Sequence, residues 1–234
     1  MEKKRINIKS ILTGIGVILL YFIGSSIYTN ILNLFGVNYS KLSIAVKSIY
    51  LGFYELILTL IIVYIYKKDF IPNLKDFIKN NTKYFKEYIK YWFMMLGLMM
   101  IANILITNFT TSLTSNNQQT IMDNLKIAPI YTFIVTVFIA PVLEELVFRL
   151  SFRKIFYKND ILFIIISGLV FGSLHVLGSF NALIDLLFII PYSIPGFIFA
   201  YIYCKSKNIC VSMSIHFIHN GIMLLLSFIL FMLT

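Results

Sequence analysis

The sequence predicts an all-α fold, a polytopic bundle of about seven transmembrane helices in which the last four form a C-terminal core. Of its 234 residues, 59% are hydrophobic and only 13% are charged, whereas soluble domains carry about 25% charged residues. So few charges could not cover a water-soluble surface. The apolar residues also occur in separate runs, each close to the ~20 residues that cross a bilayer.

Seven apolar runs follow one another along the chain, separated by polar connections. They are roughly Ile11–Leu34, Ala45–Tyr66, Tyr91–Asn108, Pro129–Val147, Ile161–Leu177, Leu183–Tyr203 and Val211–Leu233. The first run follows a basic N-terminus and continues without a clear cleavage site, so we expect a retained signal anchor. Pro141 is expected to kink the fourth run, and Pro191, Pro195 and Gly196 to break the sixth.

The net charge of +10 predicts membrane orientation and anionic-lipid contact. Nucleic acid is not an expected partner, because the basic residues lie between the apolar runs. All of the 20 Lys and Arg residues except Lys41, Lys47 and Lys126 fall in the N-terminal tail or in the second, fourth and sixth connections, counting Arg149 with the fourth. We therefore predict a multi-pass protein of the cell membrane with a cytoplasmic N-terminus and, with seven spans, an outer C-terminus.

Two polar segments separate predicted spans in the first half of the chain. Residues 69–90 mix lysines with aromatic and aliphatic residues, which suits either an amphipathic helix in the inner interface or a solvated basic loop. Residues 109–126, including Ser115 to Gln119, are expected to form a flexible outer loop. This loop divides an N-terminal transmembrane region, 1–126, from a C-terminal membrane domain, 127–234.

An acidic pair stands out in the fourth run, because ionisable groups inside spans are costly and tend to be functional or paired. Arg149 follows Glu145 by four residues, so the two share a helix face and are expected to pair. Glu144 points about 100° away and remains available. An ion pair at a helix end explains this motif at least as well as catalysis does.

The chain's three histidines all lie in its last 60 residues. His175 follows Gly172 and Ser173, which would let another helix approach closely. His216 and Asn220 share one helix face, and His219 points roughly 60° from His216. Taken singly, each histidine suits packing or interhelical hydrogen bonding. Together with Glu144, they suggest a cavity in which a carboxylate and imidazoles polarise a water, directly or through a metal.

One geometric condition must hold for such a site. With a rise of ~1.5 Å per residue, the predicted span edges place Glu144 and His175 at different depths. The fourth helix must continue past Arg149, or the helices must tilt, or the edges must be wrong. Asp185 and Glu55 are further acids, interpreted as helix-end or interfacial groups.

The three motifs resemble those of the CPBP family, the CAAX proteases and bacteriocin-processing or bacteriocin-immunity enzymes also called the Abi family. They are Glu-Glu-x-x-x-Arg at 144–149, Phe-x-x-x-His at 171–175 and His-x-x-x-Asn at 216–220, each in a predicted span and in the family's order. The resemblance covers about Pro129 to Leu226. Family members often have Gly after the Arg, where this chain has Leu150.

The resemblance implies an all-helical intramembrane endopeptidase. According to this resemblance, Glu144 and His175 would hold and activate the attacking water. His216 and Asn220 would stabilise the oxyanion, and Glu145 and Arg149 would support the site. The family is commonly described as zinc metalloproteases, so Glu144, His175 and His216 would be the metal ligands. A metal-free glutamate mechanism is equally open, since the same residue types suit both.

The expected substrate is a hydrophobic peptide or a membrane protein, in bacteriocin or signal-peptide processing or in immunity. The first alternative is a non-enzymatic membrane scaffold or regulator that keeps the fold without using the site. The second is a proton-coupled transporter, since intramembrane Glu and His also form proton relays. Many transporters show internal repeats, and none is evident in this sequence.

Overall fold

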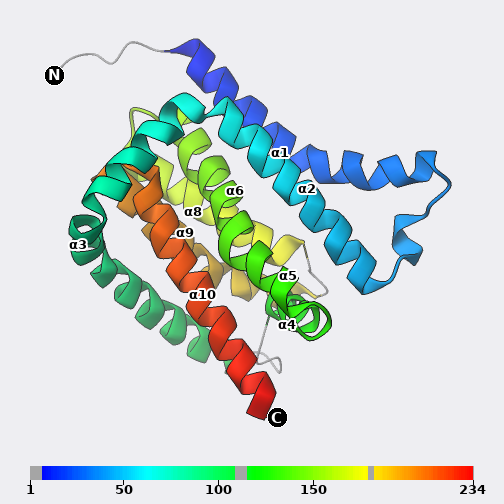
Figure 1. Ribbon diagram of the computed structural model, residues 1–234. Helices are drawn as coiled ribbons and strands as arrows, with labels where there is room; N and C mark the ends of the chain where they lie inside the picture. Colours follow the sequence, from blue (N-terminus) through cyan, green and yellow to red (C-terminus); the bar gives the residue numbers. More distant parts are fainter. Residues whose placement is uncertain (1–6, 109–114, 179–181, 234) are drawn as a thin grey trace.

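The computed structural model describes residues 7–108, 115–178 and 182–233, which form an all-helical bundle (Figure 1). Seven helices in these residues are long and apolar enough to cross a membrane. The predicted all-α bundle of about seven spans is confirmed, and the chain is a multi-pass membrane protein. Lys3, Lys4 and Arg5 of the basic tail lie outside the described residues.

The helices follow the predicted runs closely, with two of them markedly longer. The first three spans are α1 (Ile8–Leu34), α2 (Ile44–Ile65) and α3 (Lys67–Thr107), with a short η1 (Tyr39–Lys41) between α1 and α2. The fourth span is the continuous run Pro129–Ile155, made of α5 (Pro129–Ile134), η2 (Val135–Ile139), α6 (Ala140–Glu144), η3 (Glu145–Ser151) and α7 (Phe152–Ile155). The last three are α8 (Asp160–Leu177), η4 (Leu183–Phe188) with α9 (Ile189–Ser206), and α10 (Ile209–Leu233).

The basic segment 69–90 is helical and belongs to α3, so the loop alternative is wrong. The backbone of Asn80 leaves the helical region (φ −119°, ψ 16°) and marks a kink within this long helix. Beyond the kink, Tyr88 and Trp92 are buried in a cluster with Phe199 of α9 and Ile215 of α10. The aromatic residues of this segment therefore fix α3 against the C-terminal helices.

The expected flexible loop at 109–126 is wrong for its second part, whereas residues 109–114 lie outside the described residues. Residues Asn116–Ile127 form α4, whose first turn is capped because the Ser115 hydroxyl accepts the Gln118 backbone N–H. Ser48 of α2 donates to the Asn124 side chain at 2.8 Å. Leu125 is buried beside Val137 and Leu224. Tertiary contacts thus order a segment whose polar composition suggests a loop.

The fourth span ends at Ile155 rather than near Val147, and it contains two π-helical segments, η2 and η3. The first precedes Pro141, which cannot donate a backbone hydrogen bond to the preceding turn. Here the Ala140 N–H donates to the Val135 carbonyl, five residues back. Arg149 is fully buried inside this helix, so counting it with the basic connection is wrong.

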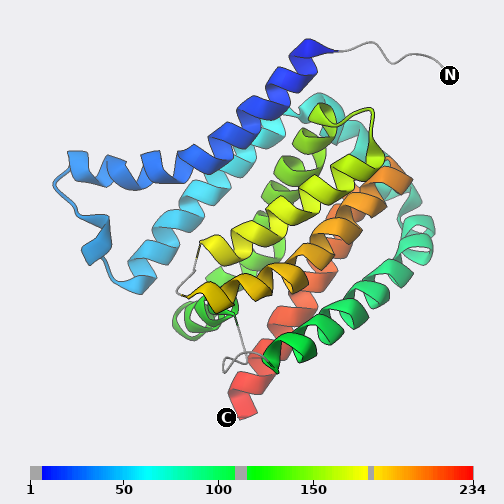
Figure 2. The same cartoon turned by 180° about the vertical axis from the view of Figure 1, so that it is seen from behind.

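The helices α8 and α9 pack at very short range through small residues (Figure 2). A Cβ atom added to Gly196 would lie 2.8 Å from the Cα atom of Gly168, and one added to Gly172 would lie 2.8 Å from the Cα atom of Ser193. The predicted close approach at Gly172 is confirmed. The predicted break of the sixth span is wrong, since α9 runs unbroken through Pro195 and Gly196.

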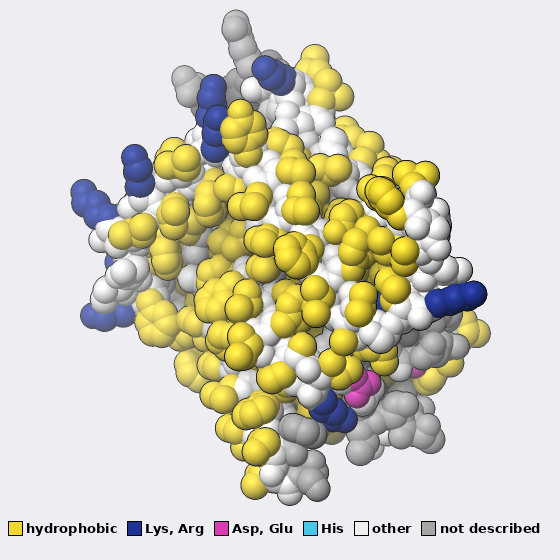
Figure 3. Space-filling view, turned by 45° about the vertical axis from the view of Figure 1, so that its right-hand side comes forward, with side chains coloured by type: hydrophobic (Ala, Val, Ile, Leu, Met, Phe, Trp, Pro, Cys, Tyr) yellow, Lys and Arg dark blue, Asp and Glu magenta, His cyan; other side chains and the backbone are white. Residues whose placement is uncertain are grey.

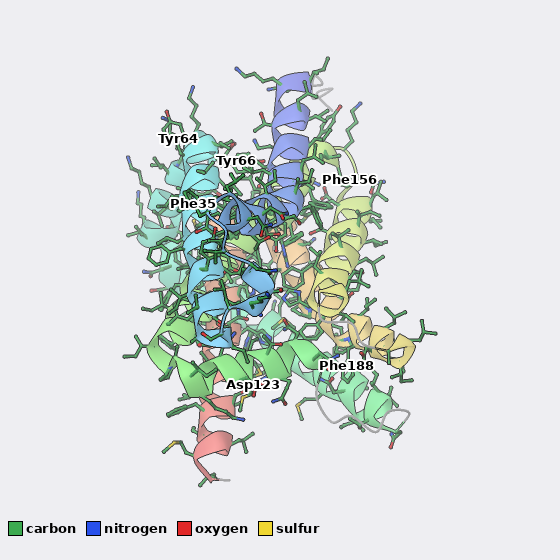
Figure 4. The ribbon with its side chains drawn as sticks, turned by 90° about the vertical axis from the view of Figure 1, so that its right-hand side faces the viewer. Phe35, Tyr64, Tyr66, Asp123, Phe156 and Phe188 are labelled. Atoms are coloured by element: carbon green, nitrogen blue, oxygen red, sulfur yellow. The ribbon has the colours of Figure 1, made fainter. Side chains whose placement is uncertain are left out.

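The bundle has two distinguishable ends. One, which we call the basic end, contains the end of α7, the start of α8, the end of α9 and the start of α10. The other, the α4 end, contains α4, the ends of α3, α8 and α10, and η4 (Figures 1 and 2). Tyr66 and Phe156 lie toward the basic end, and Asp123 and Phe188 toward the α4 end (Figure 4).

Candidate active site

The ion pair of the fourth span, Glu145 and Arg149, lies among the C-terminal helices. Glu145 and Arg149 are both fully buried, and Arg149 Nε lies 3.4 Å from Glu145 Oε1. The pairing predicted from their four-residue spacing is therefore present. A buried ion pair needs further polar contacts to offset its desolvation, and α10 supplies them to Glu145.

Glu145 connects the fourth span to α10 through both of its carboxylate oxygens. Oε2 accepts the Ser212 hydroxyl at 2.7 Å, and Oε1 lies 3.1 Å from His216 Nδ1. A carboxylate at Glu145, paired with Arg149, can only accept, so His216 Nδ1 carries the hydrogen of this contact. The ring of His216 is thereby fixed, with Nε2 turned to the opposite side.

Glu144 lies on that opposite side and faces two imidazoles. Its Oε2 lies 3.5 Å from His216 Nε2, and its Oε1 lies 4.0 Å from His175 Nε2. The structure thus brings together side chains from the fourth span, α8 and α10. Glu144 and His175 therefore lie at the same depth in the bundle, as a shared site requires. The predicted difference in depth disappears because the fourth helix continues past Arg149 to Ile155.

His175 is fixed in the same way as His216. Its Nδ1 lies 2.8 Å from the Phe171 carbonyl oxygen, which can only accept, so Nδ1 carries a proton. In the neutral ring Nε2 is then an acceptor. When the rings are neutral, both imidazoles direct an unprotonated Nε2 toward Glu144, an arrangement that can accept a hydrogen bond from a water or hold a cation.

Aromatic rings surround these polar groups. Phe199 stacks on His216 with ring centroids 4.5 Å apart, and Tyr192 stacks on His175 at 5.1 Å. The Arg149 guanidinium lies over the rings of Phe171 and Phe199, at 4.5 and 5.3 Å from their centroids. Such packing limits the rotation of each functional side chain and excludes water from the Glu145–Arg149 pair.

Asn220 and His219 complete the α10 side of the site. The Asn220 amide donates to the Thr136 carbonyl at 2.9 Å, and because an amide has two N–H groups, one remains for a ligand. His219 is 7% exposed, and its Nδ1 has no hydrogen-bond partner among the described residues. His175, His216, His219 and Asn220 all line one cavity of about 590 Å³, a volume within the range of ligand sites.

Sequence reasoning missed Ser212 and Tyr192. Ser212 lies one helical turn before His216, so a search for polar residues at i−4 from the histidine would have found it. Tyr192 gives no such signal, since its place follows from the packing of α9 on α8. Asp185 caps η4 by accepting the Ala182 N–H at 3.0 Å, as expected for a helix-end acid. Glu55 lies within α2 rather than at its end, so the helix-end interpretation of it is wrong.

The donor chemistry of Glu144, His175 and His216 suits zinc. Histidine ligands of a metal usually donate their other ring N–H to a carboxylate or a backbone carbonyl, as His216 and His175 do here. Over residues 7–108, 115–178 and 182–233, however, no three His, Cys, Asp or Glu side chains are spaced as a ready-made metal site. The residues therefore fit the metal in kind, and small side-chain movements would be needed to hold it.

Comparison with known proteins places the similarity in the C-terminal region. Residues 126–222 match the family model described as "Type II CAAX prenyl endopeptidase Rce1-like". The chain is 32% identical over 108 residues to the "Putative membrane peptidase YdiL" of Bacillus subtilis, and 27% identical over 118 residues to the UPF0177 protein YvdC of Lactococcus lactis. It is 35% identical over 115 residues to an uncharacterized protein of Mycoplasma capricolum.

These matches cover 45%, 50% and 45% of this chain, and 41%, 43% and 32% of the three relatives. The chain thus spans less than half the length of the curated relatives it matches. No solved structure matches it significantly. The matched segment contains all three motifs, and over residues 126–222 the chain is similar to the Rce1-like CAAX prenyl endopeptidases of the CPBP family.

Proposed function

We propose that the chain is an intramembrane endopeptidase that hydrolyses a peptide bond in a hydrophobic peptide or membrane-protein substrate. The observation that carries the proposal is the position of Glu144, a partly buried carboxylate facing the Nε2 atoms of two fixed imidazoles. Hydrolysis requires a base for the water and donors for the oxyanion. Both kinds of group meet in this cluster.

In the proposed reaction, Glu144 and His175 hold a water molecule beside the scissile carbonyl. Glu144 accepts a proton from the water as its oxygen attacks the carbonyl carbon. The same carboxyl group then donates that proton to the leaving amine, so Glu144 ends the cycle ionised. His175 positions the water because its unprotonated Nε2 accepts the second O–H.

Asn220 and His216 are proposed to stabilise the oxyanion. The second N–H of the Asn220 amide is available for this task. His216 already donates Nδ1–H to Glu145, so it can donate from Nε2 only as an imidazolium, which the adjacent Glu145 carboxylate stabilises. Glu145 and Arg149 act as positioning residues that fix His216.

Zinc is the alternative means of activating the water. Glu144, His175 and His216 would hold the ion, which when bound would lower the pKa of a water molecule and polarise the substrate carbonyl. In that case Glu145 and the Phe171 carbonyl would orient the two histidines, as they do in this structure. The biological role within this proposal is the processing of a bacteriocin or signal peptide, or immunity.

The test is peptide cleavage by the purified chain in nanodiscs, using a library of hydrophobic peptides. Glu144→Gln and His175→Gln should each lower kcat by about 10²–10⁴-fold, the usual contribution of general acid–base catalysis. Glu87→Gln, which alters an exposed acid on α3, is the matched control and should cleave like wild type. Thermal melting of each variant checks that it is folded.

Undiminished cleavage by Glu144→Gln would contradict the catalytic assignment. Normal cellular function of that same variant would instead favour the non-enzymatic scaffold. A chelator that abolishes cleavage, with activity restored by added zinc, would select the metal over the glutamate-activated water.

A further inference from the structure

The cavity of the candidate site lies toward the α4 end of the bundle. Its wall combines Ser115 and Gln118 of α4 with Asn103 near the end of α3 and Ser227 in the second half of α10. Phe188, at the end of η4, also lines it. The α4 end contains α4 and the ends of α3 and α10 (Figure 1), and Phe188 lies toward it in Figure 4. Two of these polar side chains bond to each other across the wall, since Gln118 Nε2 donates to Ser227 Oγ at 3.0 Å.

The basic side chains lie at the opposite end. Those of the described residues that flank the spans there are Lys9, Lys67, Lys68, Lys75, Lys79, Lys83, Lys86, Lys90, Arg153, Lys154, Lys158, Lys205 and Lys207. Among the described residues, only Lys41, Lys47 and Lys126 lie near the other ends of the spans. Figure 3 shows most of the visible Lys and Arg side chains along the upper and left edges of a largely hydrophobic face, with others at its right edge and lower part.

Lys and Arg in short connections remain on the cytoplasmic side of a membrane. By this rule the basic end faces the cytoplasm, and the cavity lies toward the opposite end of the bundle. We infer that the site receives its substrate from the non-cytoplasmic side, as an uncharged stretch of polypeptide. This inference rests on the proposed peptidase function for the nature of the ligand, but its orientation follows from charge and cavity position alone.

The uncharged nature of the substrate follows from the cavity wall. None of the described residues that line the cavity is Lys, Arg, Asp or Glu, whereas amides and hydroxyls line it at Asn103, Asn117, Gln118, Asn220, Ser115 and Ser227. These groups can pair with a peptide backbone or with neutral side chains. An acidic side chain anywhere in the cavity, or a basic one away from Glu144, would lose its hydration without gaining an ionic partner.

Thiol labelling tests the orientation without requiring any activity. The two native cysteines are buried and are first replaced by alanine. Ser227→Cys and Asn103→Cys, in the cavity wall, should react with a membrane-impermeant thiol reagent in right-side-out vesicles. Lys158→Cys, exposed at the basic end, should react only in inverted vesicles.

The reverse pattern, with the cavity cysteines labelled only in inverted vesicles, would overturn the inference. Gln119→Cys, on an exposed position of α4, reports the sidedness of the same end should a cavity variant misfold. Because labelling needs no catalysis, its result stands apart from the cleavage assay, and either proposal can fail without the other.

A matched peptide pair tests the charge preference. A peptide that wild type cleaves is compared with a version in which a Gln beside the scissile bond is replaced by Glu, which has nearly the same shape. We expect kcat/KM to fall at least about tenfold for the charged peptide. Gln118→Lys should reduce that difference by supplying an ionic partner, and the neutral Gln118→Met should not. Equal cleavage of both peptides by wild type would contradict this part of the inference.

Discussion

The N-terminal and C-terminal spans differ in how much of each helix lies inside the protein. Only 11% of the apolar window of α1 and 22% of that of α2 are buried, against 44% for the span Leu183–Ser206 and 50% for α10. Side chains such as Leu19, Phe22 and Ile27 of α1 are largely exposed, where lipid would surround them. The C-terminal helices instead contact one another.

This difference in burial agrees with which part of the chain matches the family model. A lipid-facing position accepts any apolar side chain of suitable length, whereas a buried polar group accepts only a partner of matching geometry. The family model accordingly matches residues 126–222 and not the first three spans.

The largest effect is expected from breaking the buried ion pair. Arg149→Met leaves the Glu145 charge unpaired and should lower the free energy of unfolding by about 3–5 kcal/mol. Lys47→Met in α2 removes a surface lysine that donates to the Ser40 carbonyl and should cost about 0.5 kcal/mol or less. Chemical unfolding in detergent measures both free energies.

The double variant Glu145→Gln/Arg149→Met should recover much of the stability that Arg149→Met loses. Equal losses of stability in Arg149→Met and Lys47→Met would refute the contrast between the two regions.

A glycine replacement compares backbone packing in the two regions. In Gly196→Val, the added Cβ would meet the Gly168 backbone at 2.8 Å, so α8 and α9 must separate. Overpacking costs about 1–3 kcal/mol, and we expect the upper end because backbone atoms cannot move aside as a flexible side chain can. Gly16→Val in α1, with nothing within 4 Å of its Cβ, should melt at or above the wild-type temperature. A similar loss of melting temperature in both variants would argue against close α8–α9 packing.

The smallest expected effect concerns a single hydroxyl group. Tyr192→Phe removes the contacts of the hydroxyl with Ser115 at 2.7 Å and with the Asn117 amide at 3.3 Å but keeps the ring on His175. Tyr50→Phe removes a hydrogen bond to the Tyr28 carbonyl at 2.9 Å. Both should cost about 0.5–1.5 kcal/mol in stability. Only Tyr192→Phe should also lower kcat, by a few-fold, because it loosens the ring that positions His175. An unchanged kcat in Tyr192→Phe would show that the stacking alone suffices.

Part of the site could be predicted from local spacing. Glu145 and Arg149 lie four residues apart, as do His216 and Asn220, and helix geometry alone puts each pair on one face. The bond between Glu145 and His216 could not be predicted in this way. It depends on the relative rotation and depth of two helices that are more than 60 residues apart in the chain. No local sequence pattern indicates how such helices are positioned relative to each other.

The same distinction holds for the elements of the fold. The sequence by itself determined that the chain spans the membrane about seven times, because backbone groups in a bilayer must form helices and hydrophobicity marks them. It also determined where the basic connections lie. Only the tertiary structure decided that the fourth helix extends to Ile155, that α4 is ordered, and that Glu144 meets both imidazoles. These features arise from side-chain contacts between distant segments, and such contacts exist only once the helices have packed.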